Sequence, residues 1–160
     1  MTFQVITDKQ TRDITVGNVH IEFAYKKQLF PHYYAFKKAI SGTIQVSTPE
    51  MTVFDMLRYL SLSGQINHVA TVLIELAMHM KPSILALLVR DGNVDITAAQ
   101  RLGYLLDVLE LSVDLQPLEQ ALKGKKISRR LLVTQSDAPI IEYNERWHIL
   151  VNEQVEPDEL

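Results

Sequence analysis

The densest group of residues that could do chemistry is a basic cluster near the start of the last quarter of the chain. We define the basic cluster as Lys123, Lys125, Lys126, Arg129 and Arg130. Side chains of this kind neutralise phosphates, which predicts contact with a nucleic acid or an acidic partner. A solvated loop between a helix and a strand has the same composition, so the sequence leaves both interpretations open.

A second group places aromatic residues between two pairs of lysines. The pairs are Lys26-Lys27 and Lys37-Lys38, and the aromatic residues between them include Phe30, Tyr33, Tyr34 and Phe36. Aromatic rings beside cations can stack on nucleic-acid bases. The same pattern also describes a loop that covers the hydrophobic core. Both interpretations stay open at this point.

The remaining reactive residue types form no catalytic or metal-binding pattern. The five histidines are scattered, and His68 and His79, on one predicted helix, are eleven positions apart, too far along its axis to share an ion. The chain has no cysteine, which excludes disulfides, thiolate zinc sites and a cysteine nucleophile. No phosphate-binding glycine loop, GxSxG or HExxH motif occurs. We therefore expect no enzyme activity, no cofactor and no metal, and we expect the carboxylates of Glu50 and Asp55 to be solvated.

Composition indicates an ordinary soluble protein. Of the 160 residues, 47% are hydrophobic and 22% are charged, and the formal net charge is -3, so the chain as a whole is not a binder of polyanions. The first residues contain no apolar signal core, and no apolar run reaches the length of a membrane span. We expect a cytoplasmic location and no contact with a membrane.

Alternating apolar residues predict strands in the opening segment. The run around Phe3 and Val5 comes first. The turn pair Gly17-Asn18 then separates two further alternating runs, which predicts a β-hairpin. Residues 40–46 (ISGTIQV) predict another strand before the helices begin.

Residues 47–60 (STPEMTVFDMLRYL) predict the helix that joins these strands to a helical remainder. Ser47 and Thr48 are good N-cap residues, and Pro49 suits the first helical position. Glu50, three residues after Ser47, completes the pattern of a capping box. Apolar residues then recur at helical spacing, so we expect this helix to bury one stripe.

Periodicity predicts more helices and then strands. The helices are expected at residues 65–80, from Pro82 to Leu88, after a second capping box at Thr97 and Gln100, and at residues 118–122; the strands are expected at residues 131–133 and 147–151. Glycine inside a helix costs about 1 kcal/mol relative to alanine. We therefore expect another backbone to pack closely against Gly103, which interrupts the third of these helices.

These elements predict one α+β domain over residues 1–160. It would contain N-terminal strands with a hairpin, a central cluster of about five helices, and C-terminal strands. No internal repeat and no linker rich in glycine, serine or proline divides the chain. The last residues, 153–160, form an acidic tail, and solubility is the only role that its composition suggests.

Several segments, taken in order, resemble one family. They are IQVSTPEMTVFDMLRY, NHVATVLIELA, AAQRLGYLLDVL and RWHILVNEQVEPDEL, and the strand pair in RDITVGNVHIEFAYKK also fits. This ordered set resembles the antitoxin domain of AbiEi-type proteins, the antitoxins of type IV toxin–antitoxin systems in abortive phage infection. The resemblance spans nearly the whole chain. The matching motif positions, for which it implies mainly structural roles, are Ser47, Thr48, Pro49, Glu50, Gln100, Arg101, Gly103 and Tyr104.

The resemblance implies a non-catalytic domain that opposes a cognate nucleotidyltransferase-like toxin in a bacterium. In the type IV scheme the antitoxin need not form a stable complex with the toxin. Family members typically carry a winged helix-turn-helix ahead of this domain, which binds operator DNA. Met1 here begins almost directly at the hairpin, so we expect either an excised C-terminal domain or a natural short form.

Two alternatives to the antitoxin interpretation remain. The first is a DNA-binding accessory domain of a transcriptional autorepressor, with the basic cluster on phosphates beside the operator. The second is an enzyme, such as a transferase that modifies the toxin, for which the nucleotide-binding motif is missing.

Overall fold

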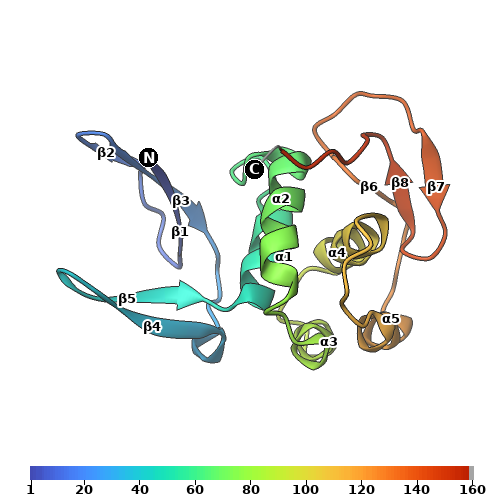
Figure 1. Ribbon diagram of the computed structural model, residues 1–160, viewed down its shortest axis with the longest axis horizontal. Helices are drawn as coiled ribbons and strands as arrows, with labels where there is room; N and C mark the ends of the chain where they lie inside the picture. Colours follow the sequence, from blue (N-terminus) through green and yellow to red (C-terminus); the bar gives the residue numbers. More distant parts are fainter. Residues whose placement is uncertain (159–160) are drawn as a thin grey trace.

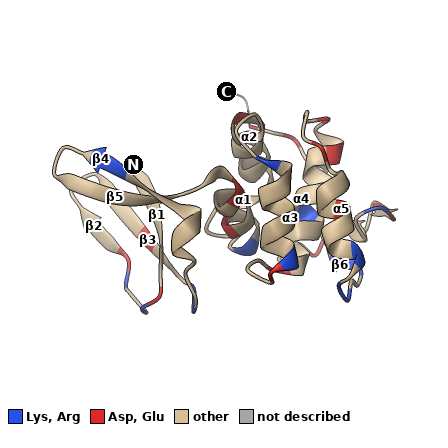
Figure 2. Cartoon of the chain, turned by 90° about the horizontal axis from the view of Figure 1, so that it is seen from below, with Lys and Arg blue, Asp and Glu red and all other residues tan. Residues whose placement is uncertain are grey.

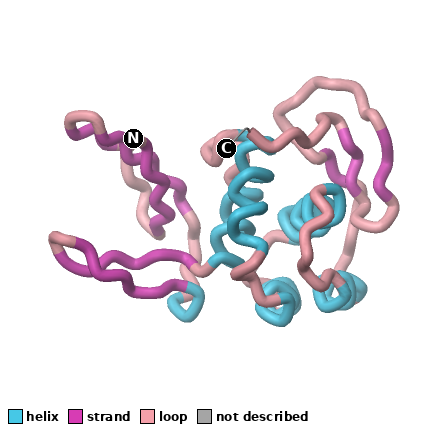
Figure 3. The backbone as a smooth tube through the Cα atoms, viewed as in Figure 1, coloured by secondary structure: helices cyan, strands magenta, loops and turns pink. Residues whose placement is uncertain are grey.

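The computed structural model describes residues 1–158 and places strands at both ends of the chain with helices between them (Figure 1 and Figure 3). The predicted α+β class is confirmed, and the described part contains the expected five α-helices. None of these helices is long and apolar enough to cross a bilayer. The elements are β1 Thr2–Thr7, β2 Ile14–Val16, β3 Val19–Tyr25, a 3-10 turn Pro31–Tyr33, β4 Tyr34–Ala39, β5 Gly42–Ser47, α1 Pro49–Arg58, α2 Gln65–Ala77, α3 Pro82–Arg90, α4 Ile96–Val108, α5 Gln116–Lys123, β6 Arg130–Leu131, β7 Glu142–Asn144 and β8 Ile149–Val151.

The opening sheet contains the predicted hairpin. Strands β2 and β3 pair antiparallel, with Val16 opposite Val19, and Gly17 in the turn has a φ of 58°, a left-handed conformation that favours glycine. The first predicted strand, β1, pairs parallel to β3 on its other side, so β3 is central.

A second, two-stranded sheet projects beside the first (Figure 1). It consists of β4 and β5, paired antiparallel from Tyr34 opposite Ser47 to Ala39 opposite Gly42. The strand predicted at residues 40–46 therefore begins too early, because Ile40 and the next residue form the turn. Strand β4 itself was not foreseen.

Helix α1 begins at Pro49 as predicted, but the capping box is wrong. Thr48 is the N-cap, and its hydroxyl accepts a hydrogen bond from the Met51 amide at 3.4 Å. Glu50 is consequently one position too early to reach back to the cap. Its Oε1 instead accepts a hydrogen bond from the Lys81 amide at 2.7 Å, which joins α1 to the start of α3.

Two other helix predictions need correction. Helix α2 ends at Ala77, so His79 lies outside it and shares no helix with His68. The N-cap of α4 is Asp95, whose carboxylate accepts from the Thr97 amide at 3.3 Å, so there is no second capping box.

The hydrophobic core lies among the five helices and the C-terminal sheet. Helix α4 packs between α1 and β8, and α3 packs against α5 (Figure 1). The sheet has the order β6-β8-β7; its strand β8 supplies Ile149 and Val151 to the core, and the turn before β8 supplies Trp147. Of residues 1–48, only Lys26 and Tyr33 are buried, so the two N-terminal sheets lie largely outside this core.

The described part of the acidic tail lies along α2. The amide of Glu156 donates to Asn67 Oδ1 at 3.0 Å, and the amide of Asp158 donates to Thr71 Oγ1 at 2.8 Å. The tail is therefore docked as well as charged, which its composition did not predict. Its residue Glu159 lies outside the described residues.

Candidate functional site

The basic cluster lies where α5 ends and β6 begins. Lys123 is the last residue of α5 and Arg130 the first of β6, and both are exposed, as is Lys126. Lys125 Nζ donates to the Arg90 carbonyl at 2.8 Å, and the Arg129 guanidinium lies 4.5 Å from the centre of the Tyr143 ring. Figure 2 shows Lys and Arg gathered at this end of the molecule, near β6. The cluster therefore presents exposed cations beside two that already have partners.

Two buried motif residues hold the backbone of the basic cluster. Gln100 Nε2 donates to the carbonyls of Ser128 and Trp147, each at 3.0 Å. Arg101 donates from Nε and Nη2 to the Leu131 carbonyl, at 3.3 and 3.0 Å. The family-like motif in α4 thus positions the segment that carries the cations. Sequence reasoning missed this link, because the partners are about thirty residues away from the motif.

Arg101 is a buried cation held mainly by backbone. Its side chain also donates from Nη1 to the Leu57 carbonyl, at the end of α1, and the residue is 6% exposed. Burial lowers the pKa of the guanidinium from its ordinary value; Asp95 opposes this change and the charge of Arg130 adds to it. Its environment is unusual, because buried charges in proteins are ordinarily paired with an opposite charge.

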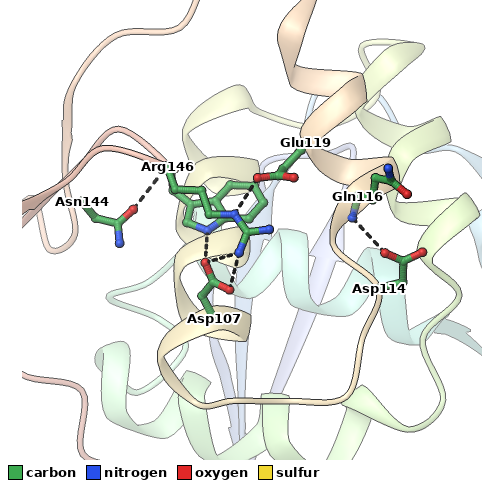
Figure 4. Close-up of polar contacts among 7 residues, drawn as sticks. Asp107, Asp114, Gln116, Glu119, Asn144 and Arg146 are labelled. Carbon is green, nitrogen blue, oxygen red and sulfur yellow. Dashed lines mark hydrogen bonds and ion pairs between the residues drawn. The ribbon is translucent and has the colours of Figure 1, made fainter.

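Gly103 packs against a side chain, so the expected backbone neighbour was wrong. A Cβ at this position would overlap the indole ring of Trp147, which is 1% exposed. Figure 4 shows the polar contacts that hold this region: the indole Nε1 donates to Asp107 Oδ2 at 2.7 Å, and Arg146 bridges Asp107 and Glu119. The hydrogen bond from Arg146 lowers the pKa of Glu119.

The other motif residues also make structural contacts. Ser47 ends β5, and its hydroxyl lies 2.6 Å from that of Thr52. Tyr104 is 4% exposed, and burial raises the pKa of its hydroxyl. Of the motif residues, Ser47 links β5 to α1 and Glu50 links α1 to the start of α3.

The lysine pair at the start of the aromatic segment is split, because Lys27 is exposed and Lys26 is not. Lys26 is buried, and its Nζ lies 2.6 Å from Asp55 Oδ1. The expectation that Glu50 and Asp55 are solvated is therefore wrong for both, since they are 4% and 6% exposed. Helix α1 turns these carboxylates inward, and each has a partner from another element.

A groove of about 710 Å³ opens between the two N-terminal sheets and α1. Its walls include Phe3, Val5 and Val46, and Tyr34 and Asp55 line it as well. Within the described residues, Tyr34 OH and Asp55 Oδ2 are buried without a hydrogen-bond partner. Burial raises the pKa of the Asp55 carboxyl, although the hydrogen bond from Lys26 acts in the opposite direction. Burial, together with the nearby charge of Asp55, raises the pKa of the Tyr34 hydroxyl to about 12.

Across residues 1–158, no three His, Asp or Glu side chains come together in a way that could hold a metal ion. The polar clusters of the described residues include the basic cluster, the Arg146 bridge and the Lys26–Asp55 pair. The exposed charged groups of the basic cluster face solvent, where a partner could bind them, and those of the other two groups bind one another.

Comparison with known proteins identifies the family. Residues 1–108 match the AbiEi antitoxin C-terminal domain, a span that runs from β1 through α4 and includes all eight motif positions. No curated protein and no solved structure matches the chain. The basic cluster and the C-terminal sheet lie beyond the matched span. Since the match covers more than half of the 160 residues, this chain belongs to the AbiEi antitoxin C-terminal domain family.

Proposed function

We propose that this chain is a single, non-catalytic antitoxin domain of a bacterial type IV toxin–antitoxin system that protects against phage. It would counteract a nucleotidyltransferase-like toxin in the cytoplasm. The observation that carries the proposal is the family match over residues 1–108. The motif residues of that match are engaged in packing and backbone hydrogen bonds, which supports a role through surface contacts.

The basic cluster is the contact surface that we favour. Lys123, Lys126 and Arg130 are exposed and lie on a backbone that Gln100 and Arg101 hold in place. A surface that is ordered before binding loses less conformational entropy when a partner docks. Exposed cations on such a surface attract an acidic partner at long range.

Growth rescue tests the antitoxin proposal. The chain is expressed together with the nucleotidyltransferase-like toxin of its own operon, and we expect the cells to grow. The triple variant Lys123→Ala, Lys126→Ala, Arg130→Ala should lose rescue at an unchanged protein level. The matched control removes exposed lysines elsewhere, Lys37→Ala with Lys38→Ala, and should keep it. If the unaltered chain is present in the cells and they still stop growing, the antitoxin proposal is wrong.

A DNA-binding accessory role is the second candidate, favoured by the same exposed cations. Contact with DNA phosphates releases counterions, so the affinity for the operator should fall steeply as salt rises. Fluorescence anisotropy with operator duplex over a range of salt concentrations measures this slope. Binding that ignores ionic strength, or that survives the triple variant unchanged, removes this candidate.

A further inference from the structure

A small polar pocket lies between the end of α1 and the segment that follows β6. Its volume is about 70 Å³, and it is lined by Arg58, Leu60, Ser61, Arg101, Val133, Thr134 and Gln135. None of these side chains is acidic, two are cationic, and three more carry hydroxyl or amide donors. The lining therefore offers positive charge and hydrogen-bond donors to a ligand.

Arg101 is the buried cation of this pocket. Asp95 favours its charge from a distance, but no carboxylate of the described residues forms an ion pair with it. The hydrogen bonds of Arg101 go to the carbonyls of Leu57 and Leu131. A buried guanidinium held only by neutral groups favours an anion beside it, because a charge in a low-dielectric setting interacts strongly with an opposite charge. Three of its five N–H groups are engaged in those bonds, which leaves donors for a ligand.

Two further arginines strengthen the positive potential. Arg58 lies in the last turn of α1, is exposed, and lines the pocket. Arg130, at the edge of the basic cluster, is close enough to act on the charge of Arg101, although the effect of Asp95 on that charge is opposite and larger. Guanidinium groups suit tetrahedral oxyanions, since their planar donors form paired, charge-assisted hydrogen bonds.

We propose that this pocket binds a terminal phosphate group, held by Arg58 and Arg101 with hydroxyl donors from Ser61 and Thr134. A space of about 10–15 Å³ holds one water, so the pocket has room for about five water-sized groups, the size of one phosphate. A terminal phosphate carries up to two negative charges near neutral pH, which two guanidiniums match. The phosphate of a mononucleotide and that of a 5′ strand end share this chemistry. The inference does not rest on the antitoxin proposal.

Inorganic phosphate, titrated into the ¹⁵N-labelled chain at constant ionic strength set with sodium chloride, provides the test. We expect saturable shifts of the Nε–H signals of Arg58 and Arg101 and of the amides of Ser61 and Thr134. Arg58→Gln should weaken binding by about tenfold or more, because it removes a charge-assisted hydrogen bond. Thr134→Val, on the exposed rim, should weaken it by a few-fold.

Matched controls distinguish binding in the pocket from nonspecific attraction of an anion to the positive charge of the surface. Arg90→Gln removes an exposed arginine outside the lining and should leave the affinity unchanged. AMP should bind and adenosine should not, and a tetranucleotide with a 5′-phosphate should bind more tightly than the same strand with a 5′-hydroxyl. Whichever of AMP and the phosphorylated strand binds more tightly identifies the source of the phosphate.

Three results would overturn the proposal. The first is the absence of saturable shifts in the pocket at 20–50 mM phosphate, which is about the millimolar limit of weak specific binding. The second is equal phosphate affinity of the Arg58→Gln variant and the unaltered chain. The third is equal affinity of the unaltered chain for AMP and adenosine. Because Arg58 is exposed, its variant is expected to keep the fold, so a loss of binding reports on the pocket.

Discussion

Replacing Gly103 by alanine tests the packing of α4 against the C-terminal sheet. On helix propensity alone the change should stabilise the chain by about 1 kcal/mol. The added Cβ, however, would overlap the Trp147 indole, which is buried and bonded through Nε1 to Asp107 at 2.7 Å. The ring therefore has to move away from a position that both packing and a hydrogen bond define.

The expected net effect is destabilisation. Overpacking a core costs roughly 1–3 kcal/mol, and weakening a hydrogen bond to a carboxylate costs about 1.5–3 kcal/mol. After the helix-propensity gain of about 1 kcal/mol is subtracted, Gly103→Ala should lose roughly 1.5–5 kcal/mol of unfolding free energy. For a chain of this size, that is a fall in Tm on the order of 10 °C.

Urea unfolding followed by fluorescence measures this loss directly, because Trp147 is the chain's single tryptophan. The matched control is Gly124→Ala, at a position with a φ of -89° and open space around the new Cβ, which should change stability by less than about 0.5 kcal/mol. Circular dichroism follows unfolding of the chains that carry Trp147→Leu, since they lack the fluorescent probe. Adding Trp147→Leu to Gly103→Ala should cost less than the sum of the two single changes, since both act on one contact. A Gly103→Ala chain at least as stable as the unaltered one would refute this reasoning.

Three other predictions concern buried and bridging polar groups. Lys26→Met should cost about 3–5 kcal/mol in urea unfolding, because it leaves Asp55 buried without its cation, and adding Asp55→Leu should recover part of that loss. Gln100→Leu should cost about 2–4 kcal/mol and speed amide exchange in the basic cluster, since two backbone carbonyls lose their donor. The pKa of Glu119 is lowered in the folded chain, so its bond with Arg146 contributes stability above the ordinary value of 4.5 that is lost as the pH falls through the folded pKa. A series of Tm values between pH 6 and pH 3 should therefore fall less steeply for Glu119→Gln, and an unchanged slope would contradict this assignment.

Local patterns predicted much of the secondary structure. The hairpin around Gly17 and the start of α1 at Pro49 were predicted correctly, because the turn glycine and the N-terminal proline impose conformations that depend on few neighbours. Details that depend on one residue of register were predicted less well. Because Thr48 and not Ser47 caps α1, Glu50 accepts a hydrogen bond from the Lys81 amide and does not complete a capping box.

The sequence predicted the cations of the candidate contact surface but not the residues that hold them in place. A dense run of lysine and arginine is a compositional signal, so the basic cluster was found by reading along the chain. The residues that hold it, Gln100 and Arg101, belong to a helix with no outward sign of this role. The pocket around Arg58 and Arg101 likewise requires α1, α4 and the segment after β6 to meet in space.

The sequence by itself determined the α+β class, most of the helices and strands, and the family, since periodicity, caps and ordered motifs are local properties. Only the tertiary structure decided the partners: Lys26 with Asp55, Gly103 with Trp147, and Arg101 with the backbone on either side of it. Many pairings of distant residues are compatible with one local pattern. Burial selects among them, because a buried charge or donor is stable only where a partner or compensating dipole lies within reach.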